Sequence, residues 1–251
     1  MPRHARKLSS TGIYHILLIG INQQQIFKDR EDNEKFIKVL AECKKISEYR
    51  LYAYCLMGNH LHLMIKVNKE PLGQIFKRIC GRYVYWYNAK YHRAGHLFQD
   101  RFKSEPIEDD ECFLRVLRYI HQNPVKAKLV NKIADYPYSS YPSYRNTKDN
   151  HLVDADFLPG KMNKEQLVKF HSESSEDTYL DITEGPIRLT DEQATEIIRK
   201  VTKGENLSAF HVLENKMRNN IISKLKNEGL SIRQISRLTG ISKGIVERGG
   251  K

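Results

Sequence analysis

Long apolar runs are missing from the sequence, since no stretch approaches the ~18 residues that a membrane-spanning helix needs. The basic start, MPRHARKLSSTG, also lacks the apolar core of a signal peptide. Cysteine is scarce, with four residues and no C-x-x-C pair: Cys43, Cys55, Cys80 and Cys112. This scarcity disfavours a disulfide framework or a zinc knuckle and is typical of a reducing compartment. We therefore expect a soluble protein of the cell interior that does not contact membranes.

Acidic residues are outnumbered, because Lys and Arg total 42 against 30 Asp and Glu, which gives the 251 residues a formal charge of +12. Such an excess says nothing about the fold, but it predicts attraction to polyanions, above all nucleic acid. Hydrophobic residues make up 40% of the chain, which is enough for a packed core. The length allows one large domain, or a medium domain with a small one.

The apolar patterns predict the order strand, helix, hairpin, helix, strand, helix. The expected ranges are 13–21, 32–47, a hairpin of 51–57 and 60–67 around Gly58-Asn59, 72–91, 97–107, and a last helix from Asp109 or Asp110 to Asn123, where Pro124 should stop it. This order favours an α+β fold in which helices pack on one antiparallel sheet. We expect a catalytic domain over 1–147, a polar linker region over 148–190 and a small all-α domain over 191–251.

Two histidines interrupt an otherwise apolar strand, MGNHLHLMIK, at His60 and His62. Alternate side chains of a strand share a face, so the two imidazoles should project together, roughly 6.5 Å apart along the backbone. They could be two ligands of one divalent ion or polar positions on a half-exposed sheet. The apolar neighbours indicate a strand that is buried on both faces, where a shared metal would satisfy both rings.

The helix RVLRYIHQNP places Tyr119 and Asn123 four residues apart, and therefore on one helical face. A tyrosine can act as a nucleophile, and an asparagine oxygen could complete a metal site with two histidines. The competing interpretation is a core tyrosine with a satisfied hydroxyl. The proline after Asn123 makes the direction of its side chain hard to predict.

Basic and aromatic residues alternate from Arg78 to Lys103, which is the mixture that single-stranded DNA binding requires. Within this stretch Tyr83, Tyr87 and Tyr91 recur every four residues and are more typical of a core-facing stripe. The candidate DNA contacts are Arg82, Tyr85, Trp86, Lys90, His92, Arg93 and His96, with Arg101, Lys103 and the N-terminal Arg3, Arg6 and Lys7 as weaker ones.

The last segment has the pattern of a helix-turn-helix unit. A helix over 215–228 ends at Gly229, a capping box from Ser231 to Gln234 opens a second helix that closes at Gly240, and Ser242 begins a third. Small helical bundles can share this pattern. The candidate DNA contacts here are Arg233, Arg237 and Lys243.

Four separated stretches carry a specific resemblance: NHLHLMIK, RYVYWYNAKYHRAGHLFQDRFKS, LRYIHQNPVKAKLV and DYPYSSYPSY. Together they resemble the REP-associated tyrosine transposases, a branch of the single-tyrosine transposases in the HUH endonuclease superfamily, over about the first 145 residues. The resemblance implies that His60 and His62 bind a divalent metal with help from Asn123, and that Tyr119 is the nucleophile. The C-terminal segment is similar to the C-terminal domain of bacterial replication initiators.

The resemblance implies an endonuclease and strand-transferase that uses Mg²⁺ or Mn²⁺ and cleaves single-stranded DNA at hairpins of repetitive palindromic elements. Such an enzyme would form a 5′-phosphotyrosine intermediate and act as a monomer or homodimer, in the cytoplasm of a bacterial-type cell and associated with the nucleoid. The alternatives are a replication or mobilisation initiator with the same chemistry and a non-catalytic DNA-binding regulator. A metallophosphohydrolase would require clustered carboxylates, which the sequence lacks near His60.

Overall fold

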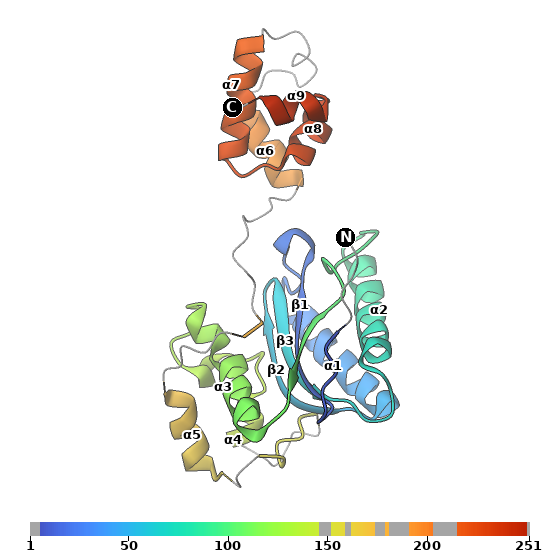
Figure 1. The fold of residues 1–251 in the computed structure, drawn as a ribbon, viewed down its shortest axis with the longest axis vertical. Helices are drawn as coiled ribbons and strands as arrows, with labels where there is room; N and C mark the ends of the chain where they lie inside the picture. The colour runs from blue at the N-terminus through green and yellow to red at the C-terminus, as the bar shows by residue number, and fades with distance from the viewer. Residues whose placement is uncertain are drawn as a thin grey trace. The chain divides into compact units, whose positions relative to one another are not determined.

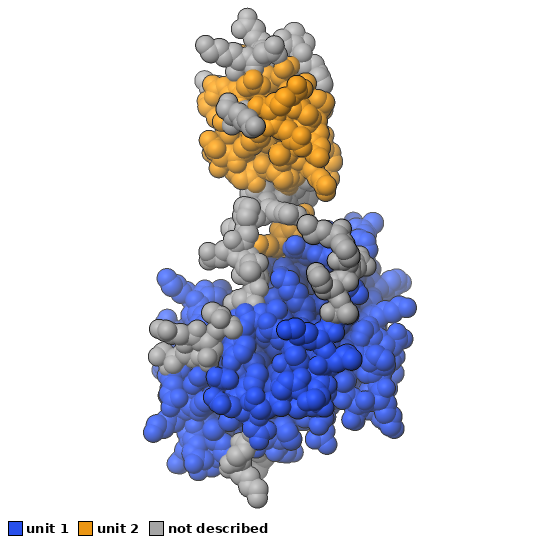
Figure 2. Space-filling view, viewed as in Figure 1, with its two compact units in different colours: residues 1–21, 25–182 blue, residues 22–24, 183–251 orange. Residues whose placement is uncertain are grey.

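The computed structural model describes residues 6–145, 152–158, 162–173, 179–180, 191–202 and 215–249. It divides into two compact units, one of residues 1–21 with 25–182 and one of residues 22–24 with 183–251 (Figure 2). None of the helices in the described ranges is long and apolar enough to cross a membrane. All four cysteines are free thiols.

The larger unit is built on one antiparallel sheet with the strand order β2-β3-β1-β4. The strands are β1 (Ile13–Ile19), β2 (Arg50–Met57), β3 (His60–Lys66) and β4 (Lys103–Ile107). In the pairing of the two central strands, β1 and β3, Leu17 lies opposite His62 and Ile19 lies opposite His60. The apolar stretches around the histidines make β3 a buried strand, as its sequence indicated.

The fourth strand is shorter than the predicted range 97–107. Lys103 pairs with Leu17, and the next pairing is the isolated bridge between Phe98 and Gly20. Between these points β1 contributes two residues, 18–19, whereas the other segment contributes four, 99–102. The two extra residues cannot enter the ladder, so this segment leaves the sheet and forms a loop beside it.

Helices α1 (Arg30–Ser47) and α2 (Leu72–Lys90) cover one face of the sheet, and α3 (Asp110–Lys126) packs on the other (Figure 1). A capping box in which Asp29 is the N-cap and Asp32 its partner begins α1. The hydroxyls of Tyr83 and Tyr87 donate to the backbone carbonyls of Ile26 and Gln25, so these two tyrosines form the core-facing stripe of α2. The α+β fold class predicted from the sequence is confirmed.

The predicted end of α3 at Pro124 is wrong, because the helix includes this proline and continues to Lys126. A proline removes one helical N–H donor, here the one that would bind the carbonyl of Ile120. The helical bond that follows is intact, since the N–H of Ala127 donates to the carbonyl of Asn123. The N–H of Leu129 donates to the carbonyl of Pro124 in the turn that ends the helix. Asn123 therefore stays on the same helical face as Tyr119.

The remaining helices described before residue 182 are short: η1 (Ile21–Gln23), η2 (Ile133–Asp135), α4 (Tyr141–Arg145) and α5 (Lys164–Ser172). Of these, α5 packs on α3, within the stretch 148–190 that the sequence analysis assigned to a linker. An Asn163–Gln166 capping box begins it. Part of that stretch is therefore a component of the larger unit.

The smaller unit consists of α6 (Asp191–Val201), α7 (Asn215–Asn227), α8 (Ile232–Thr239) and α9 (Lys243–Arg248). They surround a separate apolar core that includes Ile198, Ile222, Ile235 and Val246. Ser231 and Gln234 form the capping box of α8, and Gly240 ends this helix with a left-handed φ of 73°. The helix α6 adds a fourth member to the three helices that the sequence indicated.

Candidate functional site

The two histidines of β3 and the tyrosine of α3 meet at the interface between the sheet and this helix. The ring centroids are 5.1 Å apart for His60 and His62, and 5.8 Å apart for His62 and Tyr119. All three side chains are buried. The structure thus brings together three residues that the sequence singled out from segments about 60 residues apart.

The hydrogen bonds of the two imidazoles determine which ring nitrogens can accept a metal. His60 Nδ1 lies 2.7 Å from the side-chain oxygen of Asn59, which can only accept, so Nδ1 carries the proton and the lone pair is on Nε2. His62 Nδ1 lies 3.0 Å from His15 Nε2. No hydrogen-bonding group in the described residues reaches the buried Nε2 of His62. A metal ligand commonly has its second ring nitrogen engaged in this way, so both histidines fit a divalent ion.

Electrostatics also favours the neutral, metal-binding form of the His62 ring. Burial, together with the neighbouring His15 and His60, holds the pKa of His62 well below its ordinary value. The ring is therefore neutral, which is the form that ligates metals.

Among the described residues, a third protein ligand would have to be something other than the usual acidic, thiol or imidazole groups. Within the described ranges no group of three or more His, Cys, Asp and Glu side chains is placed to hold a metal. Asn123 lies one turn after Tyr119 on α3, is buried, and has an amide nitrogen without a hydrogen-bond partner in the described residues. An amide oxygen is a suitable ligand for Mg²⁺ or Mn²⁺.

Two neighbours of this cluster, His15 and Glu105, were not predicted from the sequence. His15 on β1 stacks on His62 with centroids 5.2 Å apart, and its Nδ1 lies 3.9 Å from a carboxylate oxygen of Glu105 on β4. The signal for His15 was a lone histidine within the apolar strand IYHILLIGI. Glu105 gave no signal, because its position opposite His15 depends on the register of β1 and β4.

The segment Tyr179–Leu180 covers the candidate nucleophile. The rings of Tyr119 and Tyr179 are 5.1 Å apart, and the Tyr119 hydroxyl donates to the carbonyl of Leu180 at 3.5 Å. The ammonium of Lys126 lies 4.8 Å from the centre of the Tyr119 ring. A cation at this distance over an aromatic face is attracted to the ring, so Lys126 helps to hold Tyr119 in place.

Several predicted DNA contacts of α2 are engaged within the protein. Lys90 contacts Asp29 and Glu31 at 2.8 Å and Asp32 at 2.9 Å. Burial alone would lower the pKa of Lys90, but the hydrogen bonds to these carboxylates raise it. Lys90 therefore ties α2 to the start of α1, and its charge is compensated internally.

The other members of this set differ in their surroundings. The Lys90 ammonium lies 5.1 Å from the centre of the Trp86 ring. Arg82 forms an ion pair with Glu42 at 3.0 Å. The Arg93 guanidinium lies 5.6 Å from the centre of the Tyr87 ring. By contrast, Tyr85 is 81% exposed. The further exposed candidates are His92, His96, Arg101 and Lys103. Arg3 lies outside the described residues.

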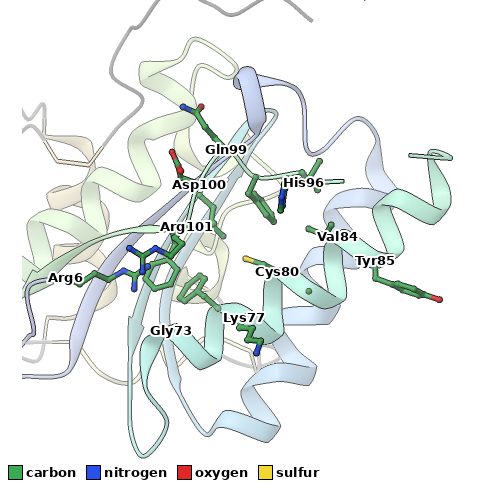
Figure 3. A pocket seen from close by; sticks show the side chains of 16 residues that line it. Arg6, Gly73, Lys77, Cys80, Val84, Tyr85, His96, Gln99, Asp100 and Arg101 are labelled. Carbon is green, nitrogen blue, oxygen red and sulfur yellow. The ribbon is translucent and has the colours of Figure 1, made fainter. Parts of the chain in front are cut away.

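Four of the predicted contacts line one groove between α2 and the loop that precedes β4. Tyr85, His96 and Arg101 all border it, and Arg6 from the N-terminal segment does too (Figure 3). In the smaller unit, Arg233 and Arg237 are exposed one turn apart on α8, and Lys243 is exposed at the start of α9, 3.4 Å from Glu247.

Comparisons with known proteins agree with this architecture. Residues 9–123 match the family model "Transposase IS200 like". A Haemophilus influenzae protein named "Putative REP-associated tyrosine transposase" is 25% identical over 153 residues, which cover 56% of this chain and 86% of that protein. A solved REP-associated tyrosine transposase bound to a REP hairpin has a TM-score of 0.50 at 16% identity, covering 58% of this chain and 86% of its own. The resemblance to the REP-associated tyrosine transposases that four motifs indicated is therefore confirmed, with residues 9–123 carrying the match to the IS200-like transposase family.

Proposed function

We propose that the chain is a divalent-metal-dependent endonuclease and strand-transferase that cuts single-stranded DNA at hairpins through a covalent bond to Tyr119. The observation that carries this proposal is the position of Tyr119 against His62, in a buried cluster where both histidines present Nε2. Hairpin DNA is the proposed substrate because the solved structure of similar fold was bound to a REP hairpin.

The proposed residues divide the chemistry between them. Polarisation of the scissile phosphate and neutralisation of its charge are what a divalent ion supplies when His60, His62 and Asn123 hold it. The Tyr119 oxygen attacks phosphorus, and the bond from phosphorus to the 3′ oxygen breaks. The phenolic proton leaves Tyr119, the departing 3′ oxygen takes up a proton, and the 5′ phosphate remains on the tyrosine. Attack by a 3′-hydroxyl reverses the step and rejoins DNA without an external energy source.

The nucleophile must become accessible for this reaction. Tyr119 is only 4% exposed, with Tyr179 and Leu180 over it. The segment Tyr179–Leu180 must therefore move away from Tyr119 when DNA binds. Residues 174–178 and 181–190 on either side lie outside the described part of the chain.

The exposed basic face of α8 supports a second DNA-binding role, for the smaller unit. Arg233 and Arg237 are exposed one turn apart on the capped helix α8, and a turn at Gly240 separates this helix from α9. Two helices joined in this way are typical of helix-turn-helix units. A replication or mobilisation initiator would use the same chemistry with such a domain, so the two candidate functions differ in their DNA target rather than in the reaction.

Removing either histidine tests the metal site. We expect His60→Ala and His62→Ala to abolish Mn²⁺-dependent cleavage of a labelled single-stranded hairpin, and chelation with EDTA to do the same to the native protein. A matched control is His171→Gln, which replaces a buried histidine of α5 outside the cluster and should keep cleavage. Full activity of either alanine variant, or of the native protein in EDTA, would show that the metal site is assigned wrongly.

A further inference from the structure

The turn between β2 and β3 is fixed by backbone hydrogen bonds from two other segments of the larger unit. The carbonyl of Gly58 accepts from the N–H groups of Ile26 and Phe27, at 2.8 and 3.0 Å. The carbonyl of Asn59 accepts from the N–H of Gly20, directly after β1, at 2.8 Å. Both residues of the turn are therefore held in place by their main chain.

The segment that holds this turn is itself anchored to α2. The Tyr87 hydroxyl donates to the carbonyl of Gln25 at 2.9 Å, and the Tyr83 hydroxyl donates to that of Ile26 at 2.6 Å. The rings of Phe27 and Tyr83, both buried, have centroids 5.8 Å apart. The turn thus rests on a packed part of the core.

The side chain of Asn59 contacts the first histidine of β3. Its oxygen lies 2.7 Å from His60 Nδ1, and His60 is only 9% exposed, so little water competes for this nitrogen. A neutral histidine in water prefers to carry its proton on Nε2, where the N–H would block a metal. An acceptor at Nδ1 favours the opposite tautomer, which leaves the lone pair of His60 on Nε2.

The backbone of the turn does not explain why asparagine occupies this position. Neither Gly58 nor Asn59 has a left-handed φ, the conformation for which hairpin turns usually select these two residues. The contact with His60 Nδ1 is made by the side chain of Asn59. The identity of Asn59 is therefore explained by its amide oxygen rather than by its backbone.

The two proposed metal ligands have supporting acceptors of different chemistry. His62 faces His15, which in turn faces the carboxylate of Glu105, whereas His60 faces the uncharged amide of Asn59. A carboxylate acceptor makes an imidazole ligand more basic. An amide oxygen fixes the proton and the orientation of the ring without adding a charge to the buried cluster.

We infer that Asn59 is a positioning residue of the metal site. From a turn whose backbone is held at both residues, its amide oxygen keeps the His60 ring in the tautomer that ligates a divalent ion before the ion arrives. The inference rests on the proposed function in taking His60 as a ligand.

The tautomer of His60 is tested in the metal-free protein. A long-range proton–nitrogen NMR spectrum distinguishes the two tautomers of a neutral imidazole, and the signals of His60 are those lost in His60→Gln. We expect the proton on Nδ1 in the native protein and in Asn59→Asp, which keeps an acceptor oxygen, and on Nε2 in Asn59→Leu. If Asn59→Leu does not fold, Asn59→Ala also removes the acceptor. The control is Gly58→Ala, whose Cβ would meet no atom within 4 Å and which should keep the native tautomer.

The consequence for metal binding is measured from the electron paramagnetic resonance signal of free Mn²⁺. Asn59→Leu should lower the affinity for Mn²⁺ by about 10- to 100-fold, whereas Asn59→Asp and Gly58→Ala should bind at least as tightly as the native protein. A native tautomer in Asn59→Leu, or a native affinity, would overturn the role of Asn59. Failure of the native protein to bind Mn²⁺, with the Nδ1 proton in place, would instead refute the proposed metal site, and the inference with it.

Discussion

His62 lies between two other imidazoles, and its Nδ1 faces His15 Nε2 at 3.0 Å. For Nε2 of His62 to hold a metal, Nδ1 must carry the proton and His15 must accept it. His15 then has its own proton on Nδ1, on the side of the Glu105 carboxylate at 3.9 Å. This chain of contacts selects the tautomer and the orientation of His62 that metal binding needs.

We therefore expect His15→Ala to lower the affinity for Mn²⁺ by about 10- to 100-fold, the usual effect of removing such a supporting partner. Isothermal titration of the apo protein with Mn²⁺ measures this directly. The variant His171→Gln, which also removes a buried imidazole, should bind Mn²⁺ like the native protein. Equal affinities of His15→Ala and the native protein would show that His15 does not orient the ligand.

Single residues were predictable where their role is local. The shared face of His60 and His62 follows from the period of a strand, and that of Tyr119 and Asn123 from the period of a helix. Lys90 was assigned to DNA because it stands among basic and aromatic residues in the sequence. Its contacts with Asp29, Glu31 and Asp32 arise only when α1 and α2 pack together, which no local pattern shows.

At the scale of elements, α5 is held on α3 by a buried polar network. His121 Nδ1 lies 2.9 Å from His171 Nε2, and His121 Nε2 lies 2.8 Å from the Ser140 hydroxyl. The side-chain amide of Gln122 donates to the carbonyl of His171 at 2.8 Å. Burial lowers the pKa of His121 well below its ordinary value and that of His171 to about 4. Both rings are neutral in the folded protein.

This network predicts a loss of stability in mild acid. The folded-state pKa values are depressed, so the stability is fully present above the ordinary histidine pKa of about 6.5 and falls as the pH decreases towards about 4. The slope is about 1.4 kcal/mol per pH unit for each histidine that must remain neutral. Urea unfolding across this range should give a shallower pH dependence for His171→Gln than for the native protein. Parallel curves would contradict the assignment.

Most helices and strands were predictable from the sequence, but three features of the fold were not. The loop at 99–102 could not be foreseen, because its residues alternate like a strand and leave the sheet only through the register with β1. The continuation of α3 through Pro124 depends on the hydrogen bonds of the following turn. The helix α5 has a capping box, but its nine residues are too short for a clear periodic signal.

At the scale of the whole molecule, the chain has two units with separate cores. The change in composition after about residue 148 predicted a second domain, and three of its helices follow from capping residues and glycines. Which of its charged residues meet DNA is a separate question, because helical bundles with an exposed basic face serve many purposes. Arg233 and Arg237 are exposed one turn apart on α8, and we propose that they contact DNA.

We expect the double variant Arg233→Gln and Arg237→Gln to weaken binding of the full chain to duplex DNA and to make binding less sensitive to salt. Each lost phosphate contact reduces the slope of log K against log salt by about 0.9. Fluorescence anisotropy between 50 and 200 mM salt measures both quantities. Lys200→Gln, which removes an exposed charge from α6, is the control. An unchanged slope in the double variant would exclude this face of α8 from DNA binding.

The most direct test of the proposed function is the identity of the residue that becomes joined to DNA. A labelled single-stranded hairpin is incubated with the protein and Mn²⁺, and the adduct is digested and mapped by mass spectrometry. We predict a 5′-phosphate linkage on the peptide that contains Tyr119, its absence in Tyr119→Phe, and its persistence in Tyr179→Phe, whose ring lies 5.1 Å from Tyr119. A covalent adduct in Tyr119→Phe, or one that maps to Tyr179 or to the tyrosines of α2, would contradict the proposed mechanism.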